Sequence, residues 1–241
     1  MRKRRPTAIK NDIYTAQMLF DNFWVIEEGG VRCFLVAGTR DAMLIDTGFG
    51  KGNLKELTRV LTSLPVYVVH THSDGDHTGC SEQFGSGFMH PLEIEHNLRN
   101  ERGLTPPPTF LPVQEGHIFN LGKFRFEVIH IPGHTPGSIA LLEHKHKLLI
   151  SGDSVQSGPT FMFGRGRNLD NYLASMKKLA QMVPSDYIIF PSHGELPVAW
   201  SIITEMIEAV DLIQAGELVG TNPDRPLPCK LYTWRNVKLL Y

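Results

Sequence analysis

The sequence lacks the features that mark several classes of protein. Its 241 residues include only three cysteines, Cys33, Cys80 and Cys229, and no CxxC pair, which indicates neither a disulfide framework nor a four-thiolate zinc site. Positive and negative side chains nearly balance, and the net charge of −1 provides no basic field to attract nucleic acid. Any metal chemistry must therefore come from histidine and carboxylate side chains.

The composition also argues against a disordered or membrane-spanning chain, because 41% of residues are hydrophobic and 20% are charged. The basic start, MRKRRP, is followed by no apolar segment with a small-residue cleavage site, so it does not resemble a signal peptide. We therefore expect a cytoplasmic protein with no membrane partner. The length suits one domain over residues 1–241.

Short apolar runs bounded by glycine or polar residues predict a chain of strands interrupted by helices. The helix expected at 51–64 has leucines at three- and four-residue spacing and ends at a proline. The other predicted helices are 168–182 and 198–215. The predicted strands are 24–28, 31–38, 42–48, 66–70, 124–131, 138–144, 147–152, 187–190, 231–234 and 237–241. We expect 101–116 to be the longest structureless segment, and loops of this length are often functional.

Residues that bind metals follow the predicted strands at their carboxyl ends. Asp46, the cluster at 70–77, His134, Asp153 and His193 each come directly after an apolar run. In sheets flanked by helices, functional sites gather outside the carboxyl ends of strands, where a rigid sheet holds the loops. Imidazole and carboxylate groups suit divalent ions, and so many of them would be costly to bury together without a cation.

These motifs also resemble a known family. A variant of HxHxDH at 72–77, PGHTPGS at 132–138, a strand ending in GD at 152–153 and a late SH at 192–193 occur in the order seen in the metallo-β-lactamase fold superfamily, including glyoxalase II and lactonase relatives. The resemblance implies an α/β fold, a four-layer αββα sandwich, with one or two metal ions at its site.

Carried over residue by residue, the resemblance aligns His72, Asp76 and His77 with the first histidine, the aspartate and the last histidine of the motif, while Asp74 stands where the family has its middle histidine. A second register, starting at His70, would put Gly75 at a ligand position.

On the first register the resemblance implies two metal ions. Their ligands would be His72, Asp74 and His134 for one ion, Asp76, His77 and His193 for the other, with Asp153 bridging them and Asp46 supporting the ligand loop.

The carboxylate at Asp74 leaves the identity of the metal open. Zinc is the first expectation, but an anionic ligand favours harder ions and makes manganese or iron credible. The expected reaction is hydrolysis of an ester-like small molecule, a lactone, thioester or phosphoester, by a hydroxide that bridges the metals, with Asp76 and Asp153 as catalytic groups. Glutathione thioesters are less expected, because only 48 residues follow His193.

Two alternatives remain open: an iron-dependent oxidative enzyme on the same fold, and a ligand-binding protein with little activity. Arg165 and Arg167 follow Asp153 in a glycine-rich stretch and are candidates for binding an anionic substrate. We expect His70 and Cys80 to be packing residues, Cys80 near the start of a helix. The oligomeric state is not predicted.

Overall fold

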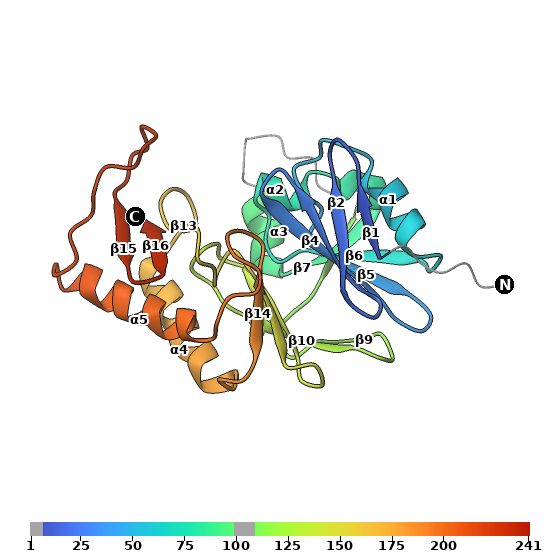
Figure 1. The fold of residues 1–241 in the computed structure, drawn as a ribbon. Helices are drawn as coiled ribbons and strands as arrows, with labels where there is room; N and C mark the ends of the chain where they lie inside the picture. Colours follow the sequence, from blue (N-terminus) through green and yellow to red (C-terminus); the bar gives the residue numbers. More distant parts are fainter. Residues whose placement is uncertain (1–6, 99–108) are drawn as a thin grey trace. The chain divides into compact units, whose positions relative to one another are not determined.

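The computed structural model describes residues 7–98 and 109–241. The chain divides into two compact units, and the described strands form three sheets (Figure 1). The first contains the residues up to Val113 and His117–Phe126, and the second contains Gln114–Gly116 and Glu127–Tyr241. That residues 1–241 form one domain stays a prediction.

An eight-stranded sheet forms the centre of the first unit, with its strands in sequence order. The strands are β1 (Ala8–Lys10), β2 (Thr15–Phe20), β3 (Phe23–Glu28), β4 (Val31–Ala37), β5 (Ala42–Ile45), β6 (Val66–Val69), β7 (Ser86–Met89) and β8 (Thr109–Pro112). The first five strands are antiparallel, and β5 to β8 run parallel. The carboxyl ends of β5, β6 and β7 therefore lie at one edge of the sheet.

Strand β5 is shorter than the predicted run 42–48. It ends at Ile45 because Asp46 has a φ of 62° and Gly48 a φ of 67°, and both angles turn the chain out of the extended conformation.

The first predicted helix is present but shorter, as α1 (Leu54–Leu61). Asn53 caps it by accepting a hydrogen bond from the backbone N–H of Glu56, and the chain becomes extended at Thr62. Leu54, Leu57 and Leu61 pack with buried residues of the sheet, including Trp24, Leu35 and Leu44. The leucine spacing thus identified the buried face of the helix.

Two further short helices were not predicted, α2 (Gly75–Thr78) and α3 (Pro91–Leu98), whereas the helix expected near Cys80 is the 3-10 helix η1 (Ser81–Phe84). Cys80 is buried and immediately precedes η1, as expected. The prediction of a structureless stretch at 101–116 is wrong at its end, because β8 pairs with β7 there. Residues 101–108 of that stretch lie outside the described residues.

A five-stranded sheet has the strand order β14-β12-β11-β10-β9. Its strands are β9 (Ile118–Asn120), β10 (Arg125–His130), β11 (Ile139–Glu143), β12 (Leu148–Gly152) and β14 (Ile188–Pro191). Because β12 and β14 are parallel, their carboxyl ends also share one edge. A smaller sheet has the order β13-β16-β15 and consists of β13 (Pro159–Phe161), β16 (Val237–Leu240) and β15 (Leu231–Trp234).

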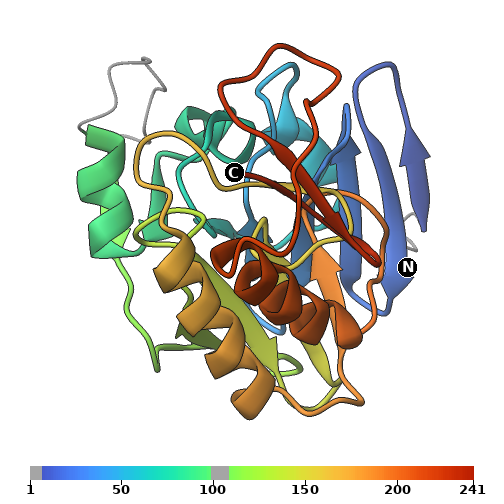
Figure 2. The same ribbon diagram turned by 90° about the vertical axis from the view of Figure 1, so that its left-hand side faces the viewer.

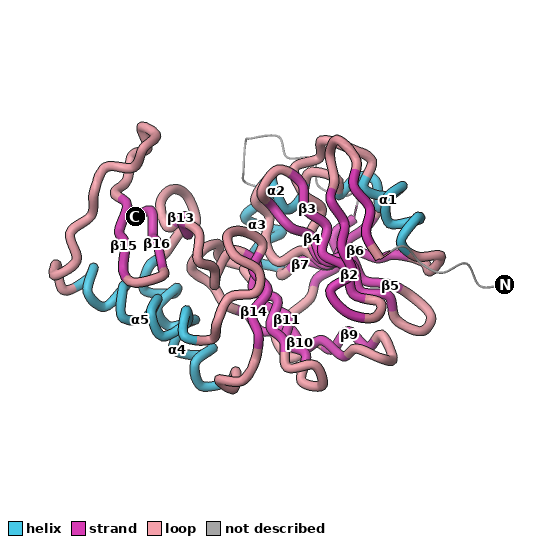
Figure 3. Tube along the Cα trace, viewed as in Figure 1, coloured by secondary structure: helices cyan, strands magenta, loops and turns pink. Residues whose placement is uncertain are grey.

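Two long helices complete the second unit, α4 (Leu169–Met182) and α5 (Ser201–Gln214), which lie side by side in Figure 2. Figure 3 distinguishes them, in cyan, from the magenta strands. Met176 of α4 and Met206 of α5 belong to one buried cluster with Ile129, Leu142 and Leu149 of the sheet. Within the described residues, no helix has both the length and the apolar character needed to span a membrane.

Candidate metal centre

Four predicted ligands lie close together in the loop that follows β6 and in α2. His72 Nε2 is 3.6 Å from Asp74 Oδ2, and His77 Nε2 is 3.8 Å from Asp76 Oδ2. The His72 and His77 rings have centroids 4.0 Å apart. Asp74 is the residue before α2, and this helical turn brings Asp76 and His77 next to it. Both histidines are buried, while the two aspartates are partly exposed.

Asp46 fixes the orientation of this loop. It follows β5, is buried, and accepts hydrogen bonds from the backbone N–H of Thr71 at 2.7 Å, the Thr71 hydroxyl at 2.7 Å and His77 Nδ1 at 2.8 Å. Burial raises the pKa of Asp46, but the charge and hydrogen bond of His77 lower it more, and the net pKa is below its usual value. Because an ionised carboxylate can only accept, His77 carries its proton on Nδ1, and the lone pair of Nε2 can bind a metal.

His72 is oriented through Thr71. The Thr71 hydroxyl donates to Asp46, so its oxygen accepts from His72 Nδ1 at 3.0 Å. A chain of two hydrogen bonds therefore fixes His72 with Nε2 as the potential ligand atom.

His70 has a different environment. It is fully buried, its Nδ1 donates to the carbonyl of His77 at 3.2 Å, and its Nε2 lies 3.1 Å from the Ser81 hydroxyl. Burial lowers its pKa to about 4. Both ring nitrogens thus hydrogen-bond to protein atoms, which suits a packing residue.

The second unit has its own cluster, centred on Asp153. Its Oδ2 lies 3.7 Å from His134 Nε2, and its Oδ1 lies 3.4 Å from His193 Nε2. Asp153 follows β12 and His193 follows β14, whose carboxyl ends share an edge of the sheet. His134 Nδ1 donates to the carbonyl of Phe161 at 2.9 Å, so its Nε2 faces Asp153. Asp153 therefore presents one oxygen to each imidazole.

The distances in both clusters fit metal ligands. The four separations of 3.4–3.8 Å exceed the usual hydrogen-bond range. Two ligands each about 2.0–2.1 Å from one zinc ion lie roughly 3.3 Å apart in tetrahedral geometry. Imidazole and carboxylate are also the donor types that zinc, manganese and iron share. The residues present thus fit divalent metal ions.

Arg165 and Arg167 lie in the loop between β13 and α4, Arg165 exposed and Arg167 half-buried. This loop is tied to the segment before His134, because the backbone N–H of Asn168 donates to the carbonyl of Gly133 at 2.9 Å. Both arginines come after β13 in the sequence, and the last residue of β13, Phe161, accepts the hydrogen bond from His134.

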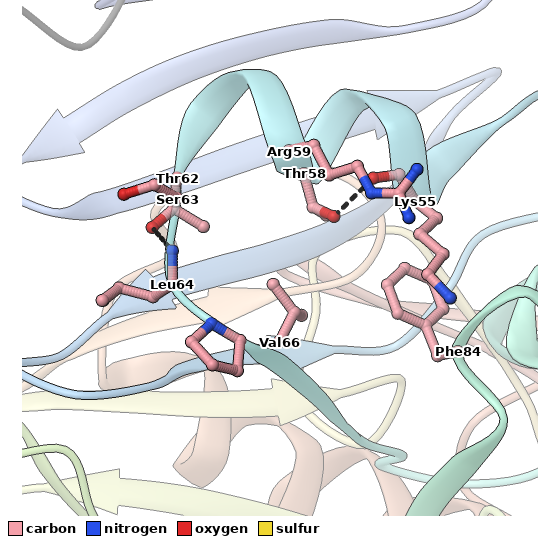
Figure 4. Close-up of a pocket in the computed structure, with 9 residues that line it drawn as sticks. Lys55, Thr58, Arg59, Thr62, Ser63, Leu64, Val66 and Phe84 are labelled. Atoms are coloured by element: carbon pink, nitrogen blue, oxygen red, sulfur yellow. Dashed lines mark hydrogen bonds between the residues drawn. The ribbon is translucent and has the colours of Figure 1, made fainter. Parts of the chain in front are cut away.

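A groove of about 430 Å³ lies elsewhere on the first unit (Figure 4). Its lining residues come from α1, from β6 and the turn before it, and from η1: Lys55, Thr58, Arg59, Thr62, Ser63, Leu64, Pro65, Val66 and Phe84. This lining includes none of the predicted metal ligands or candidate arginines.

Two buried carboxylates that accept hydrogen bonds from the loops after β5 and β6 were missed by the sequence analysis. Glu28 accepts from the backbone N–H groups of Phe49 and Lys51, at 2.9 and 2.7 Å, and Glu93 accepts from Ser73. Glu28 is the last residue of a predicted apolar strand, and this position was a weak indication that its side chain is buried. Glu93 belongs to a short helix with exposed acidic Glu95 nearby, and nothing in the sequence distinguished the two.

Comparison with known proteins identifies the class. The family model of the metallo-beta-lactamase superfamily matches residues 26–193, and the chain belongs to this superfamily.

Among its relatives, the chain is 30% identical over 212 residues to the acyl-coenzyme A thioesterase MBLAC2 of Gallus gallus, covering 71% of this chain and 76% of that protein. It is 29% identical over 177 residues to the hydroxyacylglutathione hydrolase GloC of Haemophilus influenzae, covering 64% of this chain and 81% of that one. A metallo-β-lactamase structure from Erythrobacter litoralis matches with a TM-score of 0.70 and 17% identity, over 85% of this chain and 99% of the other.

These findings confirm the family resemblance and the α/β fold of the metallo-β-lactamase type. The relatives named as hydrolases support a hydrolase on this fold, and the family together with the histidine and aspartate groups supports a site for divalent metal.

Proposed function

We propose that this protein is a metal-dependent hydrolase of acyl thioesters. The observation that carries the proposal is the pair of His–Asp clusters, in which Nε2 of each histidine lies 3.4–3.8 Å from a carboxylate oxygen. Acyl-coenzyme A and hydroxyacylglutathione, which appear in the names of two relatives, are both acyl thioesters. Lactones and phosphoesters are the other substrate classes to compare.

The proposal assigns two divalent ions to the seven predicted ligands: His72, Asp74, Asp76, His77, His134, Asp153 and His193. Zinc is the first candidate, with manganese or iron as alternatives because of Asp74. When bound, such ions would activate water near neutral pH and polarise a carbonyl group.

The chain's own groups then orient the reactants. Asp46 and the Phe161 carbonyl hold the rings of His77 and His134. Asp76, which is partly exposed, and Asp153, which presents both oxygens to imidazoles, are proposed to orient the attacking water and to accept its proton. The oxygen of this water forms a bond to the acyl carbon, the acyl carbon–sulfur bond breaks, and the thiolate of the substrate leaves.

We further propose that Arg165 and Arg167 bind the anionic carrier of the substrate, because guanidinium groups pair with phosphate and carboxylate. The double substitution R165A/R167A should raise KM about 10-fold or more, the loss of about one charge-assisted hydrogen bond. An unchanged KM for every hydrolysed substrate would refute this assignment. The small net charge supports a small-molecule partner rather than nucleic acid or membrane, and cytoplasmic location is proposed for test by cell fractionation.

The deciding experiment combines metal analysis with a hydrolysis panel. Protein purified without chelator or metal-affinity resin is analysed for zinc, manganese and iron, then assayed with acyl-coenzyme A, hydroxyacylglutathione, a lactone, a phosphodiester and a β-lactam. We expect bound metal and thioester cleavage that Asp153→Asn abolishes. Predominant iron with oxygen consumption would favour the oxidative alternative, and folded protein without metal would favour a ligand-binding role.

A further inference from the structure

Glu93 is a completely buried carboxylate in the first turn of α3. Its Oε1 accepts two hydrogen bonds from one residue, Ser73: from the backbone N–H at 2.9 Å and from the hydroxyl at 2.6 Å. Burying an ionised carboxylate is costly, and charge-assisted bonds of this kind offset the cost. These two hydrogen bonds therefore hold Glu93 against the loop after β6.

The sheet topology explains why the two residues meet. Strands β6 and β7 are parallel neighbours, so the loop after β6 and the helix after β7 begin at the same edge. The turn after β7 is fixed because the backbone N–H groups of Glu93 and Ile94 donate to the carbonyl of His90. Figure 1 allows β6, β7 and α3 to be followed in order. Glu93 thus approaches the ligand loop from a different strand than Asp46.

Ser73 lies between two of the proposed ligands, His72 and Asp74. Two bonds to a single carboxylate oxygen fix both the peptide N–H and the side chain of Ser73, and so limit rotation of the backbone on either side. The carbonyl of Asp74 in turn accepts from the backbone N–H of His77 at 2.9 Å and from the Thr78 hydroxyl at 3.1 Å. The place of Asp74 therefore also determines where α2 begins.

We propose that Glu93 is a positioning residue that sets the metal affinity of the site by holding Ser73, and with it His72 and Asp74. The inference rests on the proposed function, in which those residues bind metal. Asp46 hydrogen-bonds to Thr71 and His77, whereas Glu93 hydrogen-bonds to Ser73, so the two carboxylates hold different parts of the loop. The side chain of Asp74 is 27% exposed, and its backbone is the part that Glu93 can restrain.

A general effect of deleting a buried carboxylate must be separated from this role, and Glu143 provides the matched control. It is 1% exposed and accepts from the backbone N–H and the Nδ1 of His146, at 2.6 and 2.8 Å. These contacts lie in the hairpin between β11 and β12, at the opposite end of β12 from Asp153.

The test measures zinc affinity by competition with a chromophoric chelator for the full chain and for E93A, E93Q, S73A and E143A. Thermal unfolding of each metal-free protein reports on folding independently. Removing partners that orient metal ligands costs about 10–100-fold in affinity, which is the loss expected for E93A. E93Q keeps an acceptor oxygen and S73A keeps the hydrogen bond from the backbone N–H, so both variants should lose less zinc affinity than E93A. E143A should stay within about twofold of the unsubstituted protein.

A folded E93A with the affinity of E143A would overturn the positioning role. If E93A does not fold, unchanged affinity in both E93Q and S73A overturns it. Failure of the unsubstituted protein to bind zinc, manganese or iron would overturn the proposed function and this inference together, whereas normal binding with unchanged variants would overturn this inference alone.

Discussion

The substitution Asp46→Asn tests how the first unit orients its ligands. Two donors, the Thr71 hydroxyl and His77 Nδ1, converge on Oδ2 of Asp46, and the Thr71 backbone N–H donates to Oδ1. The amide NH₂ that this substitution places at the Oδ2 position cannot accept either bond. The hydroxyl can rotate, but His77 must move its proton to Nε2, and that removes the lone pair that binds metal.

The expected size of the effect follows from these contacts. Loss of one charge-assisted hydrogen bond to a buried group costs about 1.5–3 kcal/mol of folding free energy. Loss of the correct His77 tautomer should weaken metal binding about 10–100-fold, or roughly 1.4–2.7 kcal/mol. Asp46→Ala would leave three buried donors without this acceptor, at about 1–3 kcal/mol each, which approaches the whole stability of a domain. Asparagine is therefore the informative replacement.

The assay is zinc affinity by chelator competition, with nitrogen NMR of the imidazoles to identify the tautomer of His77. Asp186→Asn is the control, since Asp186 is exposed and pairs with Lys147, which lies just before β12, at the end of that strand opposite Asp153. An Asp46→Asn protein with the original tautomer and zinc affinity within about twofold of wild type would refute the reasoning.

Three further outcomes are expected. Burial raises the pKa of Glu115, but its hydrogen bond to Lys178 lowers the pKa more, so the pair stabilises the protein above the unfolded pKa and loses this effect as pH falls through the folded pKa. In urea titrations, E115Q should therefore lower the free energy of unfolding by about 0.2–1 kcal/mol at pH 7 and leave it unchanged below both pKa values; an equal loss at both pH values would contradict this. Gly133→Ala should cost about 2 kcal/mol or more in thermal unfolding, because Gly133 has a φ of 137° and a Cβ would lie 2.4 Å from the Tyr172 backbone; an unchanged Tm would contradict it. Chelator should lower the Tm, since metal at 100 times its Kd stabilises by about 2.7 kcal/mol, and coincident Tm values would argue against a metal site.

The sequence predicted those features that depend on local pattern. The leucine spacing of 51–64 identified the buried face of α1, and apolar runs located most strands within a few residues. The candidate ligands were chosen at the ends of predicted strands, and the structure has Asp46 after β5, Asp153 after β12 and His193 after β14. Strand β5 was predicted too long at its carboxyl end, because the apolar pattern does not reveal the positive φ of Asp46, whose carboxylate accepts three hydrogen bonds.

The buried carboxylates that accept from the loops after β5 and β6 could not be predicted in the same way. Glu28 and Glu93 gain their roles from partners 20 or more positions away in the chain, which only strand pairing brings near. Glu95, two residues after Glu93, is exposed, so the same residue type in the same helix has a different environment. Parallel pairing of β6 and β7 is a long-range property, and local periodicity does not encode it.

The charge of the first unit explains why the ligand loop and a cation should stabilise one another. Asp74 and Asp76 lie within the segment, and Asp46 and Glu93 hydrogen-bond to it. Its histidines balance this negative charge only when protonated, yet they must be neutral to bind metal. A divalent cation supplies the positive charge while leaving the imidazoles neutral. Because the imidazoles bind metal only when they are neutral, metal affinity should fall at acid pH, and chelator competition repeated at decreasing pH would measure this.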